Sequence, residues 1–196
     1  MPRSAEKFDE IREKSKRQIM ETALELFAKN GFHKTSIAMI AQKAGISTGL
    51  MYNYYGSKTA LLEAILLAGF AEIEGMFVES EAEASPYQKM ESMIEAYFAS
   101  ITEKAELWKL FLTLLLQPDV METIHGSFME FFGGMMRLIE EHFQQTGAAD
   151  PVVEAKILGA ILDGIGFHYL LDPDNYPVES VKNALIEKYC RPQLGQ

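Results

Sequence analysis

A run of small and polar residues near residue 50 has the composition of a surface that approaches another molecule closely. Ser47, Thr48 and Gly49 are small, so a partner can come close to the backbone there. The residues that follow carry hydroxyls, an amide and an ammonium: Tyr52, Asn53, Tyr54 and Lys58. Such groups donate hydrogen bonds to phosphate oxygens. The pattern therefore predicts contact with a nucleic acid, and the small residues are candidates for contact with base edges.

Other candidate residues give only weak support for a metal site or a catalytic site. Glu122 and His125 stand three apart, a spacing that di-iron carboxylate bundles use, but such a site needs a second matching pair. The remaining histidines lack a glutamate at that offset. The single cysteine, Cys190, can form neither an intrachain disulfide nor a thiolate metal site. We therefore expect no metal, no cofactor and no catalysis. The alternative is a helical-bundle enzyme, which would need acids, bases, nucleophiles or metal ligands that converge on one site.

Two short helices must position the polar run. Serines suited to helix N-caps open the segments Ser36 to Ala44 and Ser47 to Tyr54, and Gly45 lies in the tight connection between them. A preceding helix is predicted to stop at Asn30-Gly31, and a following one to begin at Ser57. These dimensions are typical of a helix-turn-helix, in which the second helix places its N-terminal part in the major groove of DNA.

The charge is divided unevenly along the chain. The formal net charge of −10 argues against nucleic-acid binding at first sight. Residues 1–60, however, hold ten Lys/Arg against six Asp/Glu, which is +4, while residues 61–196 hold eight against twenty-two, which is −14. A basic N-terminal region, residues 1–60, joined to an acidic region, residues 61–196, confines attraction for DNA to the N-terminal region. A solvated helix face would give the same division. The charge therefore supports DNA binding only together with the helix-turn-helix motif.

Helical spacing dominates the rest of the chain and predicts an all-α fold. Further helices are expected over 87–103, 105–116, 120–145, 152–171 and 178–189. We expect residues 1–60 to form a helix-turn-helix three-helix bundle and residues 61–196 to form a helical ligand-binding and dimerisation domain. The longest apolar run, Leu110 to Leu116, is far shorter than a membrane span, and the charged N-terminus lacks the apolar centre of a secretory signal. A cytoplasmic protein with no membrane contact is expected.

The ordered residues between positions 31 and 62 resemble the signature of the TetR (tetracycline repressor-like) family. The resemblance is carried by Gly31-Phe32, Thr35, Ile40-Ala41, Ala44-Gly45-Ile46-Ser47, Gly49-Leu50, Tyr52, Tyr54-Tyr55, Ser57-Lys58 and Leu61-Leu62. Tyr54-Tyr55 departs from the family pattern, which often has histidine and phenylalanine there. The resemblance implies a DNA-binding transcriptional repressor that a small molecule releases from a palindromic operator.

The same resemblance assigns roles to individual residues. Thr35 and Ser36 would touch phosphate at the start of the first short helix, and Thr48 and Gly49 would face bases. Tyr52, Tyr54 and Lys58 would hold the DNA backbone. Leu50 and Tyr55 are expected to pack in the core rather than to contact DNA.

Methionines and aromatic residues crowd three successive helices of the second region, and this crowding suits a pocket for a mainly apolar ligand. The predicted lining residues are Met93, Tyr97, Trp108, Phe111, Met121, Phe128, Phe131 and Met135. Apolar stripes at helical spacing are more often simple core, so that alternative stays open for each of them. The acidic excess favours a neutral or cationic ligand over an anion.

The last two helices are predicted to form a homodimer with a second copy, as the family resemblance implies. The expected interface residues are Ile157, Ile161, Leu162, Ile165, Tyr169 and Leu185. Two-fold symmetry would let the helix-turn-helix regions of two chains bind the two halves of a palindrome. The alternative is that both helices serve only the core of one chain. Other open alternatives are an activator or a regulator that has lost ligand response, and a protein-interaction module that docks through its acidic body.

Overall fold

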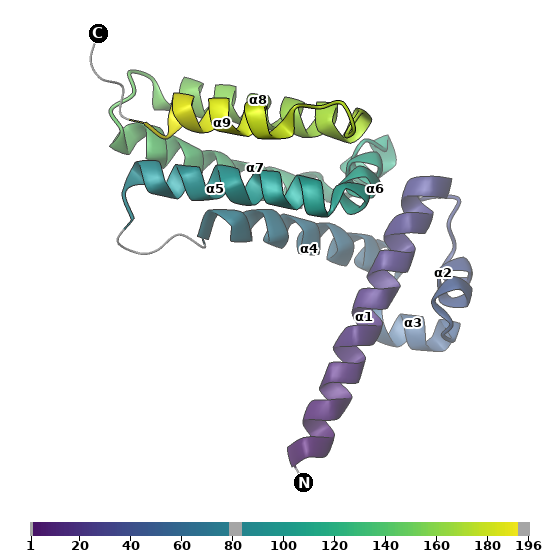
Figure 1. The fold of residues 1–196 in the computed structure, drawn as a ribbon. Helices are drawn as coiled ribbons and strands as arrows, with labels where there is room; N and C mark the ends of the chain where they lie inside the picture. The colour runs from purple at the N-terminus through teal and green to yellow at the C-terminus, as the bar shows by residue number, and fades with distance from the viewer. Residues whose placement is uncertain (1, 79–83, 192–196) are drawn as a thin grey trace. The chain divides into compact units, whose positions relative to one another are not determined.

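The structure, a computed structural model, describes residues 2–78 and 84–191, with backbone alone for residues 2–6, 9 and 76–78. These residues form α-helices joined by short connections, so the expected all-α class is confirmed (Figure 1). The helices are α1 (Pro2–Asn30), α2 (Ile37–Ala44), α3 (Thr48–Tyr55), α4 (Lys58–Val78), α5 (Pro86–Glu103), α6 (Ala105–Leu115), α7 (Pro118–Gln145), α8 (Pro151–Leu171) and α9 (Val178–Tyr189). No helix in the described part of the chain is long and apolar enough to cross a bilayer.

The chain divides into two compact units. Unit 1 consists of Met1–Gly69 together with Leu110–His125, and unit 2 consists of Phe70–Lys109 together with Gly126–Gln196. Helices α4, α6 and α7 therefore each contribute residues to both units. The segment Leu110–His125 packs with the N-terminal helices although it lies far along the chain.

Unit 1 is built around one apolar face of α1. Ile19, Ala23 and Phe27 recur at helical intervals on that face and are at most 1% exposed. The other helices of the unit bury side chains in the same core, namely Ile40, Met51, Leu61, Leu62, Leu114 and Val120. Fully burying one large apolar side chain contributes about 1.5–3 kcal/mol. This core therefore gives the short helices α2 and α3 the stability that isolated helices of eight residues lack.

Unit 2 has its core around α8. One face of α8 is buried against side chains of α5, α7 and α9, which include Ile94, Phe98, Ile139 and Ile186. Leu162, Ile165, Tyr169 and Leu185, expected from the sequence in a dimer interface, belong to this core and are only 7–9% exposed. Since they are enclosed within their own chain, we leave these four residues out of the proposed dimer surface.

Two glycines seven residues apart notch the buried face of α8. The methyl end of Met136 lies against Gly159, and the hydroxyl of Tyr97 lies against Gly166. A Cβ atom built on Gly166 would lie 2.5 Å from the Tyr97 hydroxyl oxygen. That hydroxyl donates a hydrogen bond of 2.6 Å to the Leu162 carbonyl. Absence of a side chain at Gly166 thus permits Tyr97 to bind the backbone of α8 directly.

We expect Gly166→Ala to destabilise the protein, although alanine favours a helix over glycine by about 1 kcal/mol. The new methyl group would displace the Tyr97 ring and break its hydrogen bond. Chemical denaturation followed by circular dichroism measures the change. The matched control is Gly126→Ala, because nothing lies within 4 Å of a Cβ at that helical glycine, so a small gain in stability is expected there.

A Tyr97→Phe background isolates the proposed contact. Phenylalanine lacks the hydroxyl that the methyl group introduced by Gly166→Ala would displace, so Gly166→Ala should cost less in this background than in the unmodified protein. Equal costs in the two backgrounds would show that the hydroxyl does not limit residue size at position 166.

Candidate nucleic-acid interface

Glycine and serine define the turn between α2 and α3. Gly45 ends α2 with φ of +70°, and its N–H bonds back to the carbonyls of the last helical turn. Such a left-handed backbone favours glycine because other residues meet steric strain there. Ser47 then caps α3, its hydroxyl oxygen accepting a hydrogen bond of 3.2 Å from the Leu50 N–H. Ser36 caps α2 in the same way through the Met39 N–H. The chain thus forms two short helices with one tight turn, as predicted.

Most of the residues predicted to contact DNA are exposed on these elements. Ser36 lies at the start of α2, and Ser47, Thr48, Gly49, Tyr52 and Asn53 lie on the first two turns of α3 or directly before them. Tyr54 is half-buried. Leu50, expected in the core, is 38% exposed, and Met39 of α2 is 39% exposed. The N-terminal part of α3 therefore presents small, polar and apolar groups together, with Met51 turned into the core behind them.

Thr35 lies elsewhere. Its side chain is fully buried, and its hydroxyl lies within hydrogen-bond distance of the carbonyl oxygens of Leu26 and Gly31, at 3.1 and 2.9 Å. A hydroxyl enclosed in this way is not available to a phosphate oxygen. The sequence pattern placed Thr35 correctly at the entrance to α2, but the threonine secures the loop between α1 and α2 instead of presenting its hydroxyl.

Lys58 also holds this loop. Its ammonium group donates to the carbonyl oxygens of Phe32 and Thr35, at 2.9 and 3.0 Å, and lies 3.4 Å from that of His33. It also stands 4.4 Å from the centre of the Phe32 ring, a distance that allows a cation–π interaction. An ammonium has three protons to donate, and three backbone carbonyls surround this one. We therefore assign Lys58 to the α1–α2 loop rather than to the DNA backbone.

Contacts with α1 orient the two short helices. The Tyr55 hydroxyl at the end of α3 donates a hydrogen bond of 3.0 Å to the Lys16 carbonyl. Burial raises the pKa of Tyr55 to about 12, so this donor keeps its proton at any physiological pH. Lys43 of α2 forms an ion pair with Glu25 of α1, and the hydrogen bond from Lys43 lowers the pKa of that carboxyl. Tyr55 is thus a positioning residue, a role its aromatic character alone did not indicate.

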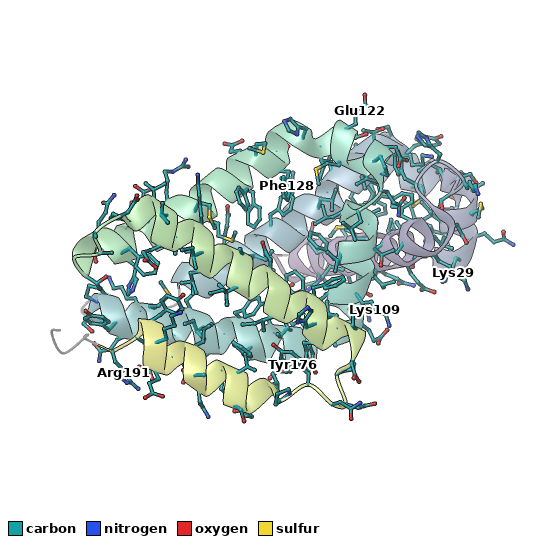
Figure 2. All side chains as sticks on the ribbon, turned by 90° about the horizontal axis from the view of Figure 1, so that it is seen from above. Lys29, Lys109, Glu122, Phe128, Tyr176 and Arg191 are labelled. Carbon is teal, nitrogen blue, oxygen red and sulfur yellow. The ribbon has the colours of Figure 1, made fainter. Side chains whose placement is uncertain are left out.

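The residues predicted to line a ligand pocket are divided between the two units. Phe111 and Met121 belong to unit 1, where the Phe111 ring lies so close to Gly69 of α4 that a Cβ there would overlap it. The other six belong to unit 2: Met93, Tyr97, Trp108, Phe128, Phe131 and Met135. Trp108 donates to the Ser100 hydroxyl at 2.9 Å, and Phe131 stacks on Phe70 at 4.4 Å between ring centres. Figure 2 labels Phe128, whose ring lies 6.0 Å from Phe70.

Residues with metal-binding chemistry are not gathered in the described residues. No group of three or more His, Cys, Asp or Glu side chains lies close enough there to hold a metal ion. Glu122 and His125 are both exposed, and Figure 2 shows Glu122 directed away from the neighbouring helices. Burial raises the pKa of the Cys190 thiol to about 12, which opposes formation of the reactive thiolate.

Comparison with known families decides what this arrangement is. Residues 19–65 match the family model described as "Bacterial regulatory proteins, tetR family", and residues 86–194 match the one described as "BetI-type transcriptional repressor, C-terminal". The chain belongs to the TetR family. The resemblance seen in the sequence is thereby confirmed, and this TetR-family protein is a DNA-binding transcriptional regulator whose helix-turn-helix is α2 and α3.

Individual relatives agree with the family assignment. The chain is 25% identical over 183 residues to the "Fatty acid metabolism regulator protein" of Bacillus subtilis, covering 87% of this chain and 91% of the relative. It is 28% identical over 167 residues to "HTH-type transcriptional regulator UidR" of Escherichia coli, covering 79% of each. Among solved structures, FadR from Bacillus subtilis in complex with stearoyl-CoA has a TM-score of 0.71 at 20% identity, covering 90% of this chain and 98% of that one. This last likeness shows the fold.

The position of Lys58 predicts that Lys58→Met acts on the loop and not on phosphate. We expect a loss of about 2 kcal/mol in unfolding free energy, because hydrogen bonds from a charged donor to several carbonyls disappear. The salt dependence of DNA binding should stay the same, whereas loss of one phosphate contact would lower its slope by about 0.9. Lys34→Met, at an exposed lysine of the same loop, is the control for stability. An unchanged stability together with a lower salt slope would return Lys58 to the DNA backbone.

Proposed function

We propose that this TetR-family protein is a dimeric repressor that binds a palindromic operator and leaves it when a mainly apolar ligand binds. The observation that carries the DNA-binding part is the exposed N-terminal half of α3, where Ser47, Thr48 and Gly49 precede Leu50 and Tyr52. Small residues at this place let the backbone of α3 approach the floor of the major groove. The basic balance of residues 1–60 supports the same assignment.

The proposed contacts divide into two kinds. Ser36, Tyr52, Asn53 and Tyr54 are assigned to phosphate oxygens, which fix position without reading sequence. Thr48 and Gly49 are assigned to base edges. The exposed side chains of Met39 and Leu50 add apolar surface on the same helices. Apolar groups recognise the methyl group of thymine in the major groove, so we expect thymines in the operator opposite Leu50.

The proposed dimer surface is the outer face of α8. Val153, Ile157, Ala160, Gly164, Phe167 and Leu171 follow one another at intervals of four and three residues. This spacing places them on one side of the helix, opposite the buried face. Ile157, Phe167 and Leu171 are 43%, 46% and 68% exposed in the single chain. Exposed apolar side chains that follow one another along one side of a helix mark a surface for another protein, so a second copy is the proposed cover.

A ligand site in unit 2 is proposed from its aromatic and methionine side chains. Tyr97 and Trp108 already donate their polar hydrogens to protein oxygens, so the lining offers a ligand mainly apolar surface. The likeness to FadR, whose structure holds stearoyl-CoA, supports a ligand with a large apolar part. A neutral or cationic head group remains the proposal for the polar end, because the acidic residues of this chain disfavour an anion. Release of DNA requires that the ligand bind the DNA-releasing conformation more tightly than the DNA-binding conformation.

Selection of duplexes from a random-sequence pool tests the DNA-binding part of the proposal. The unmodified protein should retain palindromic duplexes, with an affinity that falls as salt concentration rises. Thr48→Ala should change the preference at one or two base positions by about 1–3 kcal/mol. Thr123→Ala, at an exposed threonine of α7, is the control and should select the same duplexes as the unmodified protein. Uniform weakening across all sequences would move Thr48 to the phosphate contacts.

Light scattering tests the dimer. The unmodified protein should have the mass of two chains, and Ile157→Glu should give the mass of one, because it would bury two unpaired carboxylates near the symmetry axis. Leu138→Glu on α7 is the matched control, since Leu138 has the same exposed fraction of 43% but does not belong to the outer face of α8. A dimer that survives Ile157→Glu, or one that only Leu138→Glu disrupts, would place the interface elsewhere.

A further inference from the structure

The end of α1 leaves backbone groups that need partners. α1 stops at Asn30, and Gly31 follows with φ of +87°. The Gly31 N–H bonds back to the Phe27 carbonyl at 3.0 Å, as is usual at a helix end. The next N–H belongs to Phe32, a residue that is itself buried. Buried N–H groups almost always have a partner, so one must come from another part of unit 1.

Gln117 supplies that partner with both ends of its amide. Its Oε1 accepts a hydrogen bond of 2.9 Å from the Phe32 N–H, and its Nε2 donates one of 3.0 Å to the Phe27 carbonyl. The amide orientation follows from the partners, because the Phe32 N–H can only donate and the Phe27 carbonyl can only accept. One side chain therefore joins the last turn of α1 to the first residues of the following loop.

The backbone of Gln117 is equally well held. The residue lies between the end of α6 at Leu115 and the start of α7 at Pro118. Its carbonyl accepts hydrogen bonds from the N–H groups of Val120 and Met121, at 3.1 and 3.0 Å, so it caps α7. The amide is thus attached to a helix start and not to a loose loop. A shift of α7 along its axis would carry the Gln117 side chain with it.

The loop that Gln117 holds leads directly into the proposed DNA-binding surface. Five residues after Gly31, Ser36 caps α2, and Lys58 of α4 holds the intervening carbonyls. The same loop therefore receives one anchor from α4 and one from the junction of α6 and α7. All three of these helices also contribute residues to unit 2, where the ligand site is proposed.

We propose that Gln117 is a positioning residue for operator binding, which fixes the start of α2 and links it to the α6–α7 junction. This inference rests on the DNA-binding role proposed for α2 and α3. A ligand that displaces α6 or α7 reaches α2 through this amide, because its two hydrogen bonds cannot both persist when the junction moves. The ligand would then bind more tightly to the displaced arrangement, as release requires.

Two substitutions distinguish positioning by the amide from simple packing. Gln117→Leu keeps a similar size and removes both of these hydrogen bonds, together with a longer one of 3.5 Å from Nε2 to the Thr113 carbonyl within α6. Gln117→Glu keeps an acceptor for the Phe32 N–H, but its carboxylate faces the Phe27 carbonyl without a proton to donate. The protonated acid has one acceptor and one donor, which reproduces the amide. The glutamate variant should therefore regain function as the pH falls toward the pKa of its side chain, ordinarily about 4.3.

Affinity is measured on a duplex that the unmodified protein selects from a random-sequence pool, between about pH 8 and pH 5, the lower limit lying near the ordinary glutamate pKa. Gln117→Leu should bind about tenfold more weakly throughout, since two net hydrogen bonds are lost. Gln117→Glu should be as weak at the upper limit and recover toward the unmodified protein at the lower one. His33, Asp119 and Lys58 surround the loop, with His33 and Asp119 3.2 Å apart. They are present in every variant, so each affinity is expressed relative to the unmodified protein at the same pH.

Amide hydrogen exchange of the same proteins gives an independent readout. Exchange should accelerate at residues 32–36 in Gln117→Leu and stay unchanged in α9. Gln144→Leu, at an exposed glutamine of α7, is the matched control and should resemble the unmodified protein in both measurements. Unchanged affinity and exchange in Gln117→Leu would overturn the inference, as would a glutamate variant whose weakness does not depend on pH. Should Gln117→Leu fail to fold, the pH profile of Gln117→Glu decides alone. If the unmodified protein itself selects no duplex, the proposed function fails instead.

Discussion

The backbone groups between the end of α1 and the start of α2 are the constraint on which the DNA-binding surface depends. Within a few residues the chain leaves one helix, crosses a left-handed glycine and caps the next helix with Ser36. Side chains from far along the sequence, Lys58 and Gln117, satisfy the carbonyls and the N–H exposed on the way. The orientation of α2, and through the tight Gly45 turn that of α3, follows from this loop.

Helix α8 meets a different constraint, because it is apolar on two opposite sides. Its inner side is notched by Gly159 and Gly166 and packs within unit 2. Its outer side remains exposed in the single chain, with Phe167 and Leu171 among its most exposed residues. Burial of the first side stabilises the chain, and burial of the second is proposed to stabilise the dimer. The palindromic operator proposed for this TetR-family protein fits this division of one helix between two tasks.

Local patterns in the sequence predicted the elements well, and long-range contacts were beyond them. Caps and glycines are local signals, so the helix-turn-helix and the later helices could be placed within a few residues. Spacing could not distinguish the two apolar sides of α8, so Leu162 and Tyr169 were expected in the dimer surface although they are buried within their own chain. Thr35 was expected at a phosphate because the local sequence contains no sign of its burial. That burial depends on carbonyls contributed by α1 and the following glycine. The role of Gln117 had no local signal, since its partners lie 85 and 90 residues away.

Amide hydrogen exchange of the protein with and without a selected duplex tests the central claim most directly. DNA bound by α2 and α3 should slow exchange over residues 34–54, with most protection at the start of each short helix, and should leave the amides of α9 unchanged. The result reports contact by position and requires no substitution. Protection confined to unit 2, with residues 34–54 exchanging as in the free protein, would contradict the account.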